Sequence, residues 1–172
     1  HGGAGPSSGY EIGETEDYYL APEIIEPELD LGDAPNPALG YAFPTLRAEN
    51  GARHIIDPTI FLGAAVDPEP DGQPTVAADG DDLAGIDDED GVVFTSAIVP
   101  GEPASLEITA SAQGRLNAWI DYNADGDWAD ADEQVFADEP LGVGVNPLNI
   151  AVPPGVAQGV DLFARFRFST QG

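Results

Sequence analysis

Short apolar runs separated by turn-forming residues recur along the second half of the chain. Six such runs are rich in Val, Ile, Phe and Thr and bounded by Gly, Pro, Asn and Asp: residues 92–99, 104–112, 116–122, 134–137, 148–152 and 160–168. Runs of this length and spacing are typical of β-strands joined by turns. Because helix signals are scarce, the pattern predicts an all-β fold, a β-sandwich of the jelly-roll-like kind.

The last run alternates strictly, and successive side chains of a strand point to opposite faces of a sheet. One face carries Leu162, Ala164, Phe166 and Phe168, and the other carries Phe163, Arg165 and Arg167. We expect the first face to lie in the core. Residues 35–90 contain few periodic stretches and are predicted to form a long, loop-rich excursion over one side of the sandwich. A loop of that length needs metal ions or packing to stay ordered.

The charge of the chain is strongly negative. It holds 32 acidic residues against five arginines and no lysine, a formal net charge of −27. Self-repulsion of this size destabilises a compact state, so we expect bound cations. The charge argues against binding to nucleic acid, which needs a basic surface, and against docking on anionic lipid. No segment approaches the roughly 18 consecutive apolar residues of a membrane span. The lack of cysteine excludes a disulfide framework.

The sharpest chemical motif spans residues 121–133. Asp121, Asn123 and Asp125 offer oxygen atoms at loop positions 1, 3 and 5, and glycine follows at position 6, as in the first half of an EF-hand calcium loop. Asp127 can add its carbonyl or its carboxylate. Asp132 or Glu133 can close the loop, and we favour Glu133 because its longer side chain can chelate with both oxygens. The alternative is an Asx-rich turn without metal, but four carboxylates in so short a loop would repel one another.

Four further motifs are specific enough to indicate a family. They are DLGDAP at 30–35, NGARH at 50–54, RFRFST at 165–170 and GETEDY at 13–18. They resemble the GEVED domain, a β-rich module of large secreted and surface proteins of bacteria, in which the corresponding motifs read DFGDAP, NGARH, RFRxST and GEVEDY. The resemblance extends over nearly the whole chain. It implies that the protein is secreted and acts outside the cell or at its surface, with His1 as a processed end.

The resemblance bears on the metal ligands as well. The family pattern has an acidic residue at the position of Glu133, which supports that residue as the closing ligand. A second acidic concentration, residues 67–90, can hold one or two more calcium ions or form a solvated acidic loop. The ligands that we favour there fall in the blocks most similar to the family: Asp79, Asp81, Asp88 and Asp90.

The order of two motifs differs from the family pattern. There the RFRxST strand leads through a turn into the GEVEDY strand, whereas here GETEDY lies at the opposite end of the chain. We therefore predict an N-terminal donor strand at 1–20, a Pro/Glu-rich linker at 21–32, and a sandwich at 33–172 that lacks its final strand. The residues expected to bind the partner are Glu14, Thr15, Glu16, Asp17, Tyr18, Tyr19 and Leu20 on the donor and Arg165, Phe166 and Phe168 beside the slot. Tyr18 and Leu20 are the expected apolar contacts.

No motif for catalysis is present in the sequence: it contains no Gly-x-Ser-x-Gly, no cysteine and no phosphate-binding glycine loop. We therefore expect a protein that is not an enzyme. Two functions fit. In the first, the donor strand enters the sandwich of a neighbouring copy and builds an extracellular filament stabilised by calcium. In the second, the strand closes its own sandwich, and the protein is a calcium-dependent adhesin or ligand-binding surface module. The proline-stiffened, acidic linker favours the filament.

Overall fold

The computed structural model describes residues 17–21, 26–80 and 89–171. Within these ranges the chain is almost entirely strand and loop, which confirms the all-β prediction. One three-stranded sheet consists of β3 (Val92–Phe94), β4 (Pro103–Ala110) and β7 (Gly144–Ala151), with β4 in the middle. The second consists of β6 (Gln134–Leu141), β5 (Gly114–Ile120) and β8 (Ala164–Ser169), with β5 in the middle. All neighbouring strands are antiparallel.

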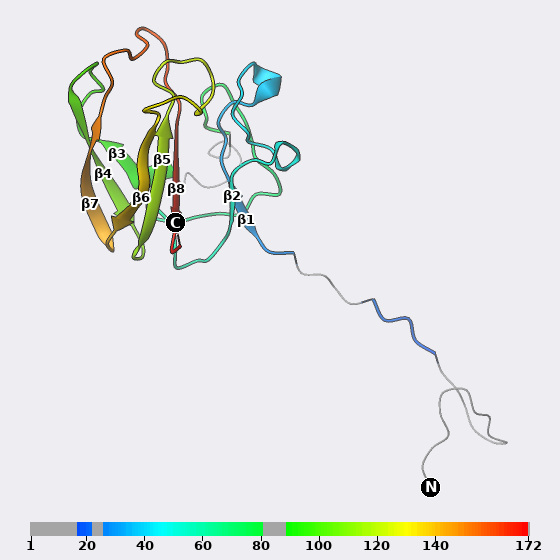
Figure 1. The fold of residues 1–172 in the computed structure, drawn as a ribbon. Helices are drawn as coiled ribbons and strands as arrows, with labels where there is room; N and C mark the ends of the chain where they lie inside the picture. Colours follow the sequence, from blue (N-terminus) through cyan, green and yellow to red (C-terminus); the bar gives the residue numbers. More distant parts are fainter. Residues whose placement is uncertain (1–16, 22–25, 81–88, 172) are drawn as a thin grey trace, which may run out of the picture.

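The two three-stranded sheets lie next to each other (Figure 1) and share one hydrophobic core. Inward-facing residues alternate along the central strands, so that Leu106 and Ile108 of β4 and Leu116 and Ile120 of β5 are all at most 1% exposed. Each of the six predicted runs overlaps one of the strands β3 to β8. The period-2 pattern of apolar residues located these strands correctly because each strand buries one face.

The predicted inner face of the last run is confirmed with one exception. Phe168 is buried, and Leu162 and Phe166 pack against the core. Ala164 is instead exposed, because it begins β8 at the margin of a groove that is described below.

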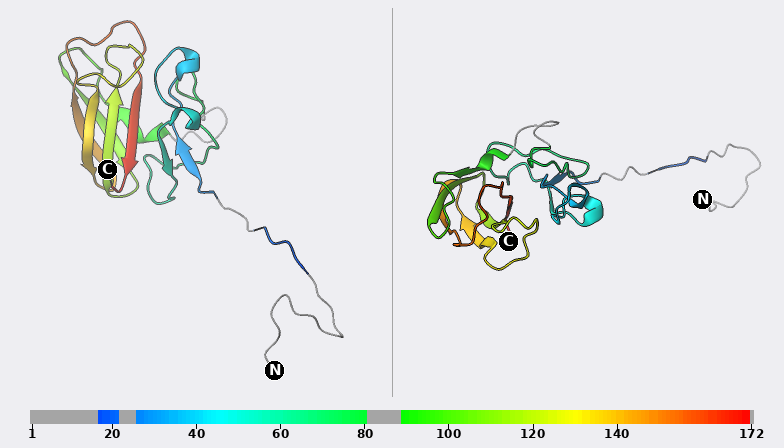
Figure 2. Two further views of the ribbon diagram at one scale, coloured as in Figure 1. Left: turned by 45° about the vertical axis from the view of Figure 1, so that its right-hand side comes forward. Right: turned by 90° about the horizontal axis from the view of Figure 1, so that it is seen from above.

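A loop-rich layer lies beside β8 (Figures 1 and 2). It contains the short pair β1 (Leu29–Leu31) and β2 (Arg53–Ile55) and the single-turn 3-10 helices η1 (Pro37–Leu39) and η2 (Arg47–Glu49); a third, η3 (Glu89–Gly91), leads into β3. The predicted linker at 21–32 is therefore too long, because its last residues form β1. Three residues show no periodicity of their own, and this strand is determined by its pairing with β2 and by burial of Leu31.

Carboxylates stabilise this layer by accepting hydrogen bonds from backbone N–H groups. The buried Glu69 accepts from the N–H of Leu31 at 3.0 Å, and the buried Asp33 accepts from the N–H of Gly80 at 2.6 Å. Glu49 accepts from the N–H of Leu46 at 3.1 Å. A buried N–H that lacks an acceptor is costly, so these contacts order a region with little secondary structure. No helix within the described ranges is long and apolar enough to cross a membrane.

Candidate functional site

The loop between β5 and β6 winds around the carboxylate of Asp121. One oxygen of Asp121 accepts from the N–H of Asp125 at 3.2 Å, and the other accepts from the N–H of Gly126 at 3.0 Å. Gly126 has a φ of 91°, a left-handed conformation that glycine adopts without strain. The glycine at loop position 6 thus makes the sharp turn that the sequence predicted.

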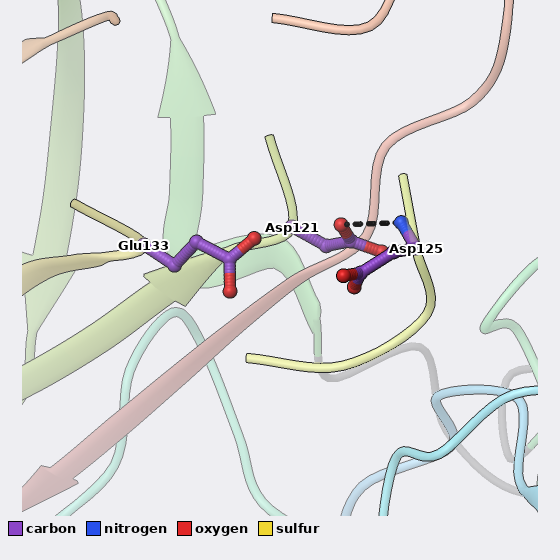
Figure 3. A group of neighbouring side chains, drawn as sticks. All are labelled: Asp121, Asp125 and Glu133. Atoms are coloured by element: carbon purple, nitrogen blue, oxygen red, sulfur yellow. Dashed lines mark hydrogen bonds between the residues drawn. The ribbon is translucent and has the colours of Figure 1, made fainter. Parts of the chain in front are cut away.

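Three of the predicted metal ligands converge inside this loop. One carboxylate oxygen from each of Asp121, Asp125 and Glu133 lies within 4.8 Å of the other two (Figure 3). Two oxygens that bind one calcium ion at about 2.3–2.6 Å can be up to about 5 Å apart, so the three side chains fit around a single cation. Glu133 is only 2% exposed, and its Oε1 has no hydrogen-bond partner among the described residues. A buried carboxylate oxygen in this state favours a bound cation.

The raised pKa values of two carboxyl groups in the cluster also favour a bound cation. Burial raises the pKa of Asp121, against the opposing effect of its backbone hydrogen bonds. Burial also raises the pKa of Glu133, and the negative charges of Asp121, Asp130 and Asp125 raise it further. Without a cation these two carboxylates therefore destabilise the folded chain when they are ionised.

In the metal-free protein, the melting temperature should rise when the pH is lowered from 7 towards 5. A carboxyl group whose pKa is raised by folding contributes stability below its ordinary pKa, and that contribution is lost as the pH rises through the folded-state pKa. Thermal unfolding in excess chelator at several pH values measures the effect. The gain should be smaller in Glu133→Gln, and an equal gain in both proteins would contradict the role of this carboxyl group.

The other predicted ligands of the loop make contacts within it. Asn123 accepts from the N–H of Asp125 at 3.0 Å and donates to Asp130 at 2.6 Å, and Asp127 accepts from the N–H of Ala129 at 2.8 Å. Asp130 was missed by the sequence analysis, although its N–H donates to Glu133 at 3.1 Å and its carboxylate lies near the cluster. Only its acidic character could have signalled it, since it falls at no ligand position of the motif.

The second predicted acidic site stays a prediction. Asp79 accepts from the hydroxyl of Thr75 at 2.7 Å, and Asp90 accepts from the N–H of Ala64 at 3.0 Å. Neither belongs to a group of three or more possible ligands in the part of the chain that the structure describes. Asp81 and Asp88 lie outside the described residues.

A groove of about 400 Å³ runs along β8, between this strand and the layer that contains β2. We use "outer edge of β8" for its edge away from β5; no strand of the described ranges pairs there. Leu62, Val92 and Phe166 contribute apolar surface to the groove. Each residue predicted to lie beside the slot, namely Arg165, Phe166 and Phe168, lines it.

The described part of the predicted donor strand lies in solvent. Tyr18, Tyr19 and Leu20 are 75%, 93% and 84% exposed, and they, like Asp17, do not line the groove. Residues 17–20 are not in a strand. Glu14, Thr15 and Glu16 lie outside the described residues. The pairing of this segment with β8 of another copy therefore stays a prediction.

Aromatic stacking connects the loop that holds the acidic cluster to the groove. Trp128, from the loop, stacks on the fully buried Phe43 with ring centroids 4.1 Å apart. The guanidinium of Arg165, from β8, lies 4.5 Å from the centre of the Trp128 ring and donates to the carbonyl of Pro44 at 3.0 Å. The same arginine thus lines the groove and contacts the loop of residues 121–133, which we call the metal loop because it holds the candidate metal ligands.

Residues 115–172 match the model of the GEVED domain family. This match confirms the resemblance on a segment that includes RFRFST, the acidic cluster and β8, whereas the motifs DLGDAP, NGARH and GETEDY lie outside the matched residues. The GEVED segment therefore carries the metal loop and one wall of the groove. No curated protein and no solved structure matches the chain.

Proposed function

We propose that this protein is the structural subunit of an extracellular filament, which is stabilised by calcium and polymerises head to tail by donor-strand insertion. In this proposal the two three-stranded sheets form a jelly-roll-like β-sandwich that is incomplete at the outer edge of β8. The GETEDY segment of the next copy supplies the final strand. The observation that carries the proposal is the groove along that edge.

The groove suits an added strand in both chemistry and length. A sheet edge presents unpaired N–H and C=O groups, which an extended segment satisfies by β-augmentation while its side chains fill adjacent pockets. β8 has six residues, and the predicted donor segment 13–20 is long enough to pair along all of it. A contact between two different surfaces of the same chain repeats from copy to copy, and it extends into a filament where the rotation between copies does not close into a ring.

Calcium is the cation that the loop fits best. The cluster offers only oxygen ligands, which hard cations prefer, and the adjacent loop side chains and carbonyls can supply more. Magnesium demands a tighter octahedron and substitutes poorly in such a flexible set. Each calcium ion also removes two negative charges from a chain of net charge −27. Secretion, which the GEVED resemblance implies, is consistent with calcium binding and with an extracellular filament.

The full chain in millimolar calcium should form filaments that electron microscopy and light scattering detect, and deletion of residues 1–20 should abolish them. The deleted protein should then bind a synthetic peptide of residues 9–20, because the peptide fills the groove without offering a new one. A soluble monomer that carries its own residues 13–20 in the groove would contradict the filament. That outcome would favour the second function, a calcium-dependent adhesin or ligand-binding surface module.

A further inference from the structure

The arginines of the chain are concentrated along the groove. The chain has only five arginines, and three of them, Arg53, Arg165 and Arg167, line this one surface together with His54. Three acidic residues line the groove as well: Asp33 accepts from the N–H of Gly80 and its charge acts on Arg165, and Asp57 accepts from the N–H and hydroxyl of Thr59. Asp30 lies 4.0 Å from His54.

The β8 wall is the most positive part of the groove. Arg165 and Arg167 lie two residues apart and therefore face the same side of the strand. Arg165 donates to the Pro44 carbonyl and interacts electrostatically with Asp33, and Arg167 lies 3.1 Å from the His54 ring. Burial and the charge of Arg167 lower the pKa of Arg165 to about 10, an effect that Asp33 only partly offsets. The pKa of His54 is lowered by burial and by Arg167 too.

The predicted donor has the complementary pattern. Glu14 and Glu16 are also two residues apart, so that in an extended segment they share one face and Thr15 lies on the other. In the antiparallel register that aligns Glu14 with Arg167, Glu16 would lie opposite Arg165. Thr15 then faces the apolar side of the groove near Phe166. By the same alternation, Tyr18 and Leu20, the apolar contacts expected from the sequence, share a face with Glu14 and Glu16 and lie on the side of Arg165 and Arg167.

We infer that Arg165 and Arg167 select the inserted strand by pairing with Glu16 and Glu14 of a second copy of this chain. This inference rests on the proposed donor-strand assembly and adds its register and its specificity. Pairs of opposite charge across two strands stabilise one register, while like charges directly opposite each other destabilise it. The chain as a whole is strongly acidic, so the pair Arg165 and Arg167 distinguishes the groove electrostatically from the acidic surfaces. A strand with carboxylates on one face is therefore attracted to the groove.

The test exchanges the charges of one pair in the full-length chain. Arg167 is the better choice, because Arg165 also contacts Trp128. Glu14→Arg and Arg167→Glu should each raise the concentration needed for filament formation at least about tenfold, as expected when a charge pair becomes a repulsion. An equimolar mixture of the two variants should assemble again as an alternating copolymer, because each donor now meets an oppositely charged groove. Sedimentation and electron microscopy in calcium measure both.

The outcomes separate a failure of filament formation from a failure of the charge pairing. If the wild-type chain forms no filaments, the proposed function fails. If both variants assemble as the wild type does, the filament stands and the charge pairing is wrong. Failure of the mixture to assemble, with each variant folded, also overturns the pairing. Should Arg167→Glu fail to fold, Glu14→Arg still decides, because it alters only the donor; normal assembly of that variant refutes the inference.

Discussion

Glu133→Gln should be more stable than the wild type in chelator and less stable in calcium. Without metal, the substitution removes a buried negative charge that lies against Asp121 and Asp125, so the free energy of unfolding should increase. With calcium, it removes a charged ligand that can bind through two oxygens. A ligand that binds only the folded state contributes about 2.7 kcal/mol at a free concentration one hundred times its Kd, or roughly 5–10 °C in a chain of this size.

Thermal unfolding in chelator and over a calcium titration measures this reversal. Asp132→Asn is the matched control: Asp132 is the neighbouring acidic residue, exposed, with a φ of 72° that asparagine tolerates well. The control should keep the calcium response of the wild type. If it loses that response while Glu133→Gln retains it, Asp132 closes the loop instead. Melting curves of the wild type that do not move between millimolar calcium and chelator would remove the metal site altogether.

Phe43→Ala should destabilise the protein by about 3–5 kcal/mol, the usual cost of truncating a fully buried phenylalanine. Phe43 is 0% exposed and contacts the rings of Trp128 and Phe163, so the cavity would open between the loop-rich layer and the GEVED segment. Because Trp128 would lose its stacking partner, the metal loop should also lose order. We therefore expect a smaller calcium-induced rise in melting temperature for this variant than for the wild type.

Leu39→Ala is the comparison for this substitution. Leu39 lies in the same layer, in η1, but is 41% exposed, and its truncation should cost less than about 1 kcal/mol. Denaturant unfolding of both variants in calcium compares the two free energies directly. Equal losses would mean that the contact between Phe43 and Trp128 contributes little to the attachment of the layer.

The proposals also connect the metal loop with assembly. Arg165 contacts Trp128 of the metal loop and lines the groove. An ordered loop therefore fixes the position of this guanidinium in the groove that a donor strand would enter. Calcium is then expected to act on filament formation in two ways, by reducing the repulsion within an acidic chain and by positioning Arg165. The second effect follows from contacts between residues that are far apart in the sequence.

Local patterns in the sequence determined the strands of the core and the shape of the metal loop. The alternation in β4 and β8 is visible because each strand buries one face, and a period of two residues does not depend on which strand lies next to it. The turn at Gly126 follows equally from local chemistry, since aspartate side chains and glycine specify the backbone over a few residues. RFRFST is a further local pattern: it carried part of the family resemblance and lies in the segment that matches the family.

Only the tertiary structure decided which residues meet. Asp121, Asp125 and Glu133 converge while Asp127 points to the backbone of Ala129, although all four are acidic and lie in one loop. The strand β1 forms in a segment predicted as linker because β2 pairs with it, a contact across more than twenty residues. The arginines of the groove come from β2 and β8, at opposite ends of the folded domain sequence. Long-range pairing and burial make these contacts, and neither leaves a periodic trace in the local sequence.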